Sequence, residues 1–231
     1  MHTGSFIERK SGTLYTDKMK ITKFGHCCLL VEENGVRLLT DPGVFTAEAH
    51  VALTDIDVIL YTHEHADHYH LESLKQLLAN NPGVVVICNE GVSALLEAEH
   101  ILHTKITDGS LDHKGVAITG VSGTHEEIYS TIPRIQNTGF LIAGSLWYPG
   151  DAFINPNVAI DVLALPVSAP WMKLSEAVDY AIMLKPRVAF PVHDMILHPQ
   201  FAGFVPVMVE TLLKPHTIAF RALEAGKEYD F

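Results

Sequence analysis

The segment His63-x-His65-x-Asp67-His68 constrains this chain more than any other feature of its sequence. It follows Val58–Tyr61, a continuous apolar run of the kind found in strands buried on both faces. Side chains two positions apart on an extended backbone point the same way, so the first two histidines can converge on one ion. A turn after them would direct the aspartate and the last histidine to a second ion. The segment therefore predicts a metal site, because imidazole and carboxylate suit zinc and neighbouring transition metals.

Three more candidate ligands each follow a predicted strand. His125 comes after Val116–Val121, Asp151 after Ser145–Tyr148, and His193 after Val188–Val192. Loops at one edge of a sheet build the site in α/β enzymes, so these side chains are expected at that edge. Each has an ordinary interpretation when taken singly, as a surface histidine or a turn aspartate. Together with segment 63–68 they predict a site for two metal ions.

The remaining sequence mixes strand and helix patterns without a dividing linker. Further strands are predicted at 20–24, 29–31, 36–40, 84–88, 139–142 and 161–167, and helices near 71–78, 92–99, 174–184 and 204–213. Hairpin turns are predicted at Asn34-Gly35, Asp108-Gly109 and Ala143-Gly144. This mixture indicates the α/β class, as a four-layer αββα sandwich in which two mixed sheets face each other and helices lie outside.

The domain organisation is simple. Residues 1–18 are polar and lack periodicity, so we expect a disordered N-terminal extension, or a natural start at Met19. Residues 19–231 are expected to form a single domain, since 231 residues with 48% hydrophobic content can bury a full core. The three cysteines, Cys27, Cys28 and Cys88, do not suggest a disulfide framework and are interpreted as small core residues.

Charge and hydropathy exclude several classes of partner. The net charge of −11, without any basic run, argues against nucleic acid, because phosphate binding uses clustered Lys and Arg. No apolar stretch approaches the roughly 20 residues that span a bilayer, so membrane insertion is not expected. Arg9 and Lys10 lack an apolar region behind them, so no secretory signal is predicted and a cytoplasmic location is the expectation.

The order of the candidate ligands resembles that of the metallo-β-lactamase superfamily. Matching motifs are Gly25-His26-Cys27-Cys28-Leu29-Leu30, Thr40-Asp41-Pro42, Tyr148-Pro149-Gly150-Asp151 and Pro191-Val192-His193. They are similar in particular to the subgroup that holds uncharacterised metal-dependent hydrolases, ascorbate-6-phosphate lactonase and N-acylphosphatidylethanolamine phospholipase D. The similarity covers residues 20 to 200 approximately, and its motifs are specific for fold and metal but weak for substrate.

The resemblance implies a role for each candidate ligand. The first metal would be held by His63, His65 and His125, the second by Asp67, His68 and His193, and Asp151 would bridge the two. Asp41 would hydrogen-bond the loop that carries the first ligands and so orient their imidazoles. His26 matches the Gly-His pattern of the subgroup without an assigned chemical role. His70 departs from the pattern, since related sequences often have a small or acidic residue there; it either begins the helix that carries Leu71 or is a spare ligand.

The implied function is hydrolysis at a binuclear metal site. Two divalent ions, zinc first and manganese or iron otherwise, would share a water and lower its pKa towards about 7. The metal-bridging hydroxide would attack an ester, lactone or phosphodiester of a small molecule, and Asp67 would orient this nucleophile and move its proton. We therefore expect a metal-dependent hydrolase with two metal cofactors and a small-molecule substrate.

Other functions on the same scaffold remain as alternatives. Redox di-iron proteins resemble H-x-E-x-D, but this chain has His65 in the second ligand position, which favours hydrolysis. The acidic charge disfavours a nucleic-acid-processing nuclease, and the intact ligand set disfavours an inactive metal-binding protein. Candidate substrate contacts are Trp171, Met172 and His198. The first two either wall the pocket or cap the core beneath a helix, and His198 is either a surface residue or part of the pocket.

Overall fold

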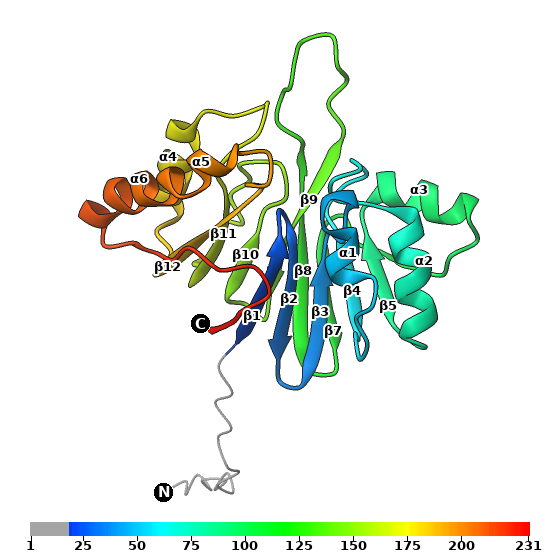
Figure 1. Cartoon of the computed structure of the whole chain (residues 1–231). Helices are drawn as coiled ribbons and strands as arrows, with labels where there is room; N and C mark the ends of the chain where they lie inside the picture. The colour runs from blue at the N-terminus through cyan, green and yellow to red at the C-terminus, as the bar shows by residue number, and fades with distance from the viewer. Residues whose placement is uncertain (1–18) are drawn as a thin grey trace, which may run out of the picture.

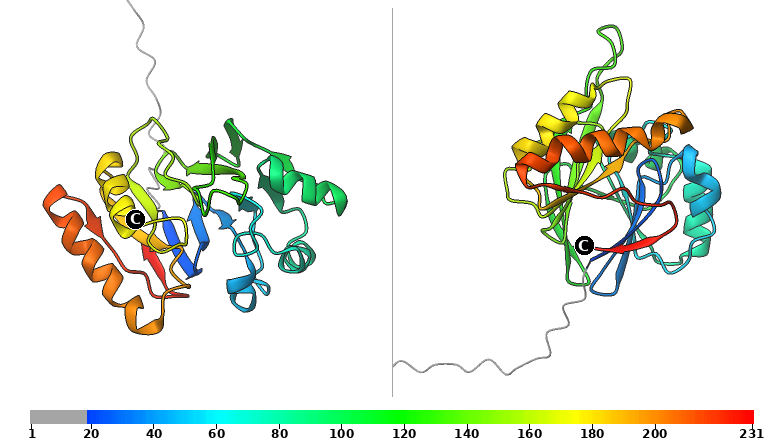
Figure 2. Two further views of the ribbon diagram at one scale, coloured as in Figure 1. Left: turned by 90° about the horizontal axis from the view of Figure 1, so that it is seen from above. Right: turned by 60° about the vertical axis from the view of Figure 1, so that its left-hand side comes forward.

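Two seven-stranded sheets face each other in the computed structural model, which describes residues 19–231 (Figure 1). The first sheet has the order β14-β1-β2-β3-β4-β5-β6 and the second β13-β12-β11-β10-β9-β8-β7. Helices cover the outer face of each sheet, as the two further views show (Figure 2). The predicted four-layer sandwich of two mixed sheets is therefore confirmed. The predicted extension at residues 1–18 lies outside the described residues.

The strands of the first sheet are β1 (Lys20–Gly25), β2 (Cys28–Glu33), β3 (Val36–Thr40), β4 (Val58–Tyr61), β5 (Val85–Cys88), β6 (Thr104–Lys105) and β14 (Glu228–Asp230). Those of the second sheet are β7 (Gly109–His113), β8 (Val116–Thr124), β9 (Gln136–Ile142), β10 (Leu146–Tyr148), β11 (Val162–Pro166), β12 (Val188–Val192) and β13 (Ala219–Phe220). The helices are α1 (Ala47–His50), α2 (Leu71–Asn80), α3 (Glu90–Ala98), α4 (Leu174–Leu184), α5 (Pro199–Ala202) and α6 (Phe204–Leu213), with short 3-10 helices η1 (Val44–Thr46) and η2 (Lys214–His216).

The core has three parts, one between the sheets and one under each helical layer. Leu29, Leu38 and Phe190 belong to the cluster between the sheets. The apolar faces of α2 and α3 cover the first sheet, and those of α4 and α6 cover the second. Cys27, Cys28 and Cys88 are buried free thiols, as expected for small core residues. Within residues 19–231, no helix has the length and apolar character needed to cross a bilayer.

Two of the three predicted hairpin turns are confirmed. The backbone is left-handed at Asn34-Gly35 (φ 50° and 76°) and at Ala143-Gly144 (φ 53° and 65°). The prediction of a turn at Asp108-Gly109 is wrong, because Gly109 already begins β7. The β7–β8 hairpin instead turns at Lys114-Gly115, where φ is 51° and 87°. Both dipeptides end in glycine, and the pairing of His113 with Val116 selects the second one.

The topology brings one edge of both sheets together. In the first sheet, β3 to β6 are parallel, and in the second sheet β10 to β13 are parallel. The loops at the carboxyl ends of such strands gather at a single edge. The candidate ligands lie in the loops that follow β4, β8, β10 and β12.

Candidate metal centre

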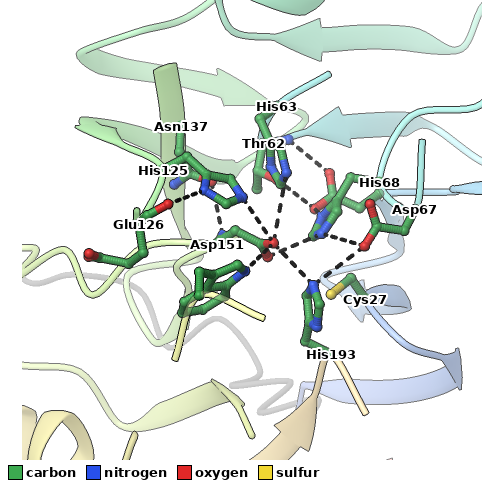
Figure 3. A network of polar contacts seen from close by, with 12 residues as sticks. Cys27, Thr62, His63, Asp67, His68, His125, Glu126, Asn137, Asp151 and His193 are labelled. Atoms are coloured by element: carbon green, nitrogen blue, oxygen red, sulfur yellow. Dashed lines mark hydrogen bonds and ion pairs between the residues drawn. The ribbon is translucent and has the colours of Figure 1, made fainter. Parts of the chain in front are cut away.

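The seven predicted ligands meet at this edge, around the carboxylate of Asp151. Figure 3 labels all of them except His65. The predicted ligand atoms fall into two groups, and within each group all of them lie within 4.8 Å of one another; the buried Cys27 thiol forms a third such group with His68 and Asp151. The first group is His63, His65, His125 and Asp151, and the second is His26, Asp67, His68 and His193. The structure thus brings together every ligand that the sequence proposed and adds His26 to the second group.

Asp151 contacts both groups. Its Oδ2 lies 3.4 Å from His125 Nε2 and 3.9 Å from His63 Nε2. The same carboxylate also contacts the second group. Its Oδ2 lies 3.0 Å from His193 Nε2, and its Oδ1 lies 3.1 Å from His68 Nε2. A carboxylate has two oxygens, whereas an imidazole offers one nitrogen per metal. The other carboxylate among the seven, Asp67, contacts histidines of the second group only, so it is Asp151 that has the geometry of a bridge.

Four of the ligand histidines have an acceptor at Nδ1. These acceptors are Thr62 Oγ1 for His63 (3.0 Å), Asp41 Oδ2 for His68 (2.8 Å), the Glu126 carbonyl for His125 (2.6 Å) and the Ser168 carbonyl for His193 (2.7 Å). Thr62 Oγ1 accepts from His63 because its own hydrogen is donated to Asp41. Each acceptor holds the imidazole hydrogen on Nδ1 and leaves the Nε2 lone pair facing the centre, which is the tautomer that binds a metal.

The inward atoms fit metal ions in their chemistry as well. Nε2 of His63, His68 and His125, and Oδ1 of Asp151, are buried without a hydrogen-bond partner. Leaving a polar atom buried and unpaired costs about 1–3 kcal/mol. A cluster of such atoms, all of them zinc-type ligands, is therefore explained by cations that bind them.

Asp41 fixes the loop that carries four of these ligands. The carboxylate is fully buried and accepts hydrogen bonds from Thr62 N (2.8 Å), Thr62 Oγ1 (2.7 Å), His68 Nδ1 (2.8 Å) and Tyr148 Oη (2.7 Å). Gly43 then brings the chain against the same loop, since a Cβ at this position would lie 1.9 Å from the Asp67 carbonyl oxygen. Only glycine permits this close approach.

The charges at the centre depend strongly on one another. Burial alone would raise the pKa of Asp151, but the positive charges of His68 and His193 hold it well below its usual value. Conversely, burial lowers the pKa of His193 but Asp151 and Asp67 raise it to about 11. The carboxylates thus stabilise positive charge at the second group, and divalent cations supply that charge while leaving Nε2 unprotonated.

A pocket of about 330 Å³ opens onto the centre. It is lined by His65, Ala66, Asp67, His125, Ile128, Asp151, Pro170, Trp171 and His193. Trp171 forms part of the wall, and its indole Nε1 donates to Asp151 Oδ2 over 3.0 Å. Met172 is half-buried and packs against the core beneath α4, so the core-packing interpretation describes it better. His198 is exposed at the start of α5, where its Nδ1 accepts from Gln200 N, and it is not part of the pocket lining.

Sequence reasoning missed the contact that His26 makes. His26 Nε2 lies 3.0 Å from Asp67 Oδ2, and its ring centroid is 4.1 Å from that of His193. The available signal was its position directly after a strand, which it shares with the predicted ligands. His70, in contrast, belongs to neither group, and its Nδ1 contacts Ser73 Oγ at the start of α2 (2.8 Å).

Comparison with known proteins matches most of the chain. The family model of the beta-lactamase superfamily domain covers residues 20–193. Protein Rv0786c of Mycobacterium tuberculosis is 38% identical over 191 residues, which are 80% of this chain and 88% of the relative. A UPF0173 protein of Pyrococcus furiosus is 30% identical and the match covers 76% and 83% of the two chains. The UPF0173 metal-dependent hydrolase of Methanocaldococcus jannaschii is 27% identical, with coverage of 75% and 83%.

A solved structure shares the same fold. Igni18, a metallo hydrolase of the archaeon Ignicoccus hospitalis, superposes with a TM-score of 0.71 at 23% sequence identity. The match covers 93% of this chain and 98% of Igni18. At this level of identity, the likeness concerns the fold alone.

Proposed function

We propose that this chain, which belongs to the β-lactamase superfamily and the UPF0173 family, hydrolyses an ester or lactone of a small molecule at a centre of two divalent metal ions. One observation carries the proposal. Asp151 lies between two groups of inward-facing ligand atoms, several of them buried and unpaired, at the floor of a pocket. The relative from Methanocaldococcus jannaschii is called a metal-dependent hydrolase, which agrees with this assignment.

The donor set determines how the metals would be held. His63, His65 and His125 form the first site, Asp67, His68 and His193 the second, and Asp151 joins them. Divalent ions in such sites supply Lewis-acid activation of water and of a carbonyl or phosphoryl oxygen. Imidazole and carboxylate favour zinc, and manganese or iron are alternatives.

Asp67 is the residue that we assign to the proton transfer. It lines the pocket, and its side chain is 23% exposed, whereas the other ligands of the second group are almost fully buried. In the metal-free protein, burial would raise the pKa of Asp67, but hydrogen bonds from protonated His193 and from His26 hold it far below the usual value. The lowered pKa keeps this carboxylate ionised, so it would orient the attacking water by accepting a hydrogen bond from it, and it would take up the proton only because bound metal ions lower the pKa of that water.

The pocket lining favours neutral carbonyl substrates over the phosphodiester that the sequence left open. None of its lining residues is Lys or Arg, and Ile128, Pro170 and Trp171 present apolar surface next to the metal ligands. An anionic group on the substrate, away from the metal ions, would therefore have no Lys or Arg side chain in the pocket lining to pair with. The same observation, with the net charge of −11, supports a small-molecule substrate rather than nucleic acid and disfavours a nuclease. We retain the cytoplasm as the proposed location.

A substrate panel tests the proposal. The purified protein, loaded separately with zinc and manganese, is assayed with neutral aryl esters, lactones of increasing chain length, thioesters, a phosphorylated lactone and a phosphodiester. We expect metal-dependent turnover of neutral esters or lactones, loss of that turnover in Asp151→Asn, and normal turnover in the control His70→Ala. A preference for phosphodiesters would contradict the substrate class, and no turnover by the metal-loaded protein on any member would contradict hydrolysis.

A further inference from the structure

The turn between β1 and β2 places a histidine against the second group of ligands. Gly25 (φ 136°) and His26 (φ 46°) both have left-handed backbones, and the His26 side chain is fully buried. The His26 carbonyl accepts a hydrogen bond from His193 N over 3.0 Å, and its ring packs edge-on to Phe45 at 5.1 Å. Backbone and packing together therefore fix the direction of the imidazole.

The imidazole of His26 points at the carboxylate of Asp67, and not at the space between the ligand atoms where a metal ion would lie. Its Nε2 lies 3.0 Å from Asp67 Oδ2. An ionised carboxylate only accepts hydrogen bonds, so His26 Nε2 carries the hydrogen. Asp67 Oδ2 is also 3.4 Å from His193 Nε2 and 3.8 Å from His68 Nε2. His26 thus holds the oxygen that points towards the other ligands of the second site.

His26 differs from the neighbouring histidines in its tautomer. Its Nε2, the nitrogen that faces the centre, carries the hydrogen and donates it. In His63, His68, His125 and His193, an acceptor holds the hydrogen on Nδ1 and frees Nε2 for a metal. The Nδ1 of His26 is buried without a partner, so no acceptor selects that tautomer. Metal-binding histidines nearly always have such an outer partner. The arrangement of His26 is therefore that of a hydrogen-bond donor to a ligand.

We propose that His26 is a positioning residue, whose Nε2–H holds the Asp67 carboxylate in the orientation that the second metal requires. This rests on the proposed two-metal function, and it gives the Gly25-His26 motif a role. Removing the outer partner of a metal ligand lowers metal affinity about 10–100-fold. We expect a loss of this size at the second site alone, because His26 has no hydrogen bond to a ligand of the first group.

Three substitutions separate positioning from ligation. In His26→Gln, the side-chain amide reaches the place of Nε2 and donates to Asp67, but it is a poor ligand for zinc. His26→Asn is too short to reach Asp67, and His26→Ala removes the donor altogether. His70→Ala is the matched control, because His70 lies beside the ligand loop and outside both groups.

The readout is metal binding itself. Zinc affinity is measured by competition with a chromophoric chelator, and the Co²⁺-substituted proteins are compared by visible absorption. We expect His26→Asn and His26→Ala to bind the first ion as the parent does and the second about 10–100-fold more weakly. We expect His26→Gln and His70→Ala to remain close to the parent in affinity and spectrum. Thermal unfolding of the metal-free proteins identifies any variant that fails to fold, and the Gln–Asn pair then decides the question.

Two results would overturn the inference. A second-site loss in His26→Gln as large as in His26→Ala would make His26 a metal ligand. Unchanged binding of both ions in His26→Asn and His26→Ala would leave it without a role at the centre. Neither result depends on turnover, so failure of the inference is distinguishable from failure of the proposed hydrolysis, which the substrate panel measures.

Discussion

The indole of Trp171 donates a hydrogen bond from Nε1 to Asp151 Oδ2 over 3.0 Å. Asp151 is the carboxylate that joins the two ligand groups, so this contact ties one wall of the pocket to the middle of the metal centre. The ring also lies edge-on to His125 at 5.9 Å and to His193 at 5.8 Å. Trp171 is thereby placed to orient the bridge and to report on metal binding.

We predict that Trp171→Phe weakens metal binding about 10–100-fold, because phenylalanine keeps an aromatic wall but loses the donor to Asp151. Metal binding should change the fluorescence of the parent, and this change should disappear in the variant. The second tryptophan, Trp147, is the internal control, since it is buried and donates to Tyr180 Oη at 2.7 Å, away from the centre. A metal-dependent fluorescence change that persists in Trp171→Phe would assign the signal elsewhere.

We predict that Asp151→Ala damages the site more than the loss of a single histidine, because it removes the only carboxylate within residues 19–231 that contacts both groups. Metal analysis should give about two equivalents for the parent and clearly fewer for Asp151→Ala and for His193→Ala. Turnover should fall by orders of magnitude while the fold persists. His198→Ala, at an exposed helix start, serves as the control. One tightly bound ion in the parent at saturating metal would replace this scheme with a mononuclear one.

His50 predicts a specific pH dependence of stability. Burial lowers its pKa from 6.5 to about 4, so the folded protein keeps it neutral where the unfolded chain protonates it. Between these values the unfolded chain binds more protons, and stability therefore falls as the pH falls from 6.5 towards 4, by up to about 3 kcal/mol. Urea unfolding of the metal-free protein at pH 7.5 and pH 5 should show a smaller difference for His50→Gln than for the parent. Equal differences would exclude His50 as the titrating group.

We predict that residues 1–18 are dispensable for folding and activity, since they carry no core periodicity and no candidate site residue. The pairing of the two chain ends begins after them, because Met19 is buried and its carbonyl accepts from Phe231 N at 2.9 Å. A chain that begins at Met19 should match the parent in melting temperature and turnover. Aggregation or lost activity of the shortened chain would show that the segment is a structural element.

We predict that nucleic acid does not bind tightly, because the net charge is −11 and the pocket lining contains no Lys or Arg to contact phosphates beyond the metal centre. Filter binding at low salt should give no submicromolar complex with RNA or DNA. A submicromolar complex that weakens as salt increases would contradict this and restore the nuclease alternative.

The sequence predicted the buried elements best. The bounds of β3, β4, β12, α4 and α6 agree with those expected, because their apolar runs or helical spacing reflect burial. The sequence did not predict the edge strands of the two sheets, which are β6, β7, β13 and β14. These strands are largely exposed, so their sequences carry no hydrophobic alternation, and pairing with a neighbouring strand defines them instead. The short helices η1 and α1 also lack a periodic pattern, since they are shorter than two turns.

By itself, the sequence predicted the seven side chains that meet at the candidate metal centre. The spacing of His63, His65, Asp67 and His68 after a buried strand is local, and His125, Asp151 and His193 repeat the same strand-end position. The chemistry of imidazole and carboxylate then limits what such a cluster can bind. These inferences needed only residue type, spacing and the alternation of strands and loops.

The tertiary structure alone decided how each ligand is held. His26 meets Asp67 across 41 residues and Trp171 meets Asp151 across 20, through contacts between separate loops. The acceptor of His193 is the backbone carbonyl of Ser168, and every residue type carries such a carbonyl. The tautomer of a histidine and the orientation of a carboxylate depend on which atoms surround them after folding, and spacing along the chain contains no signal for that.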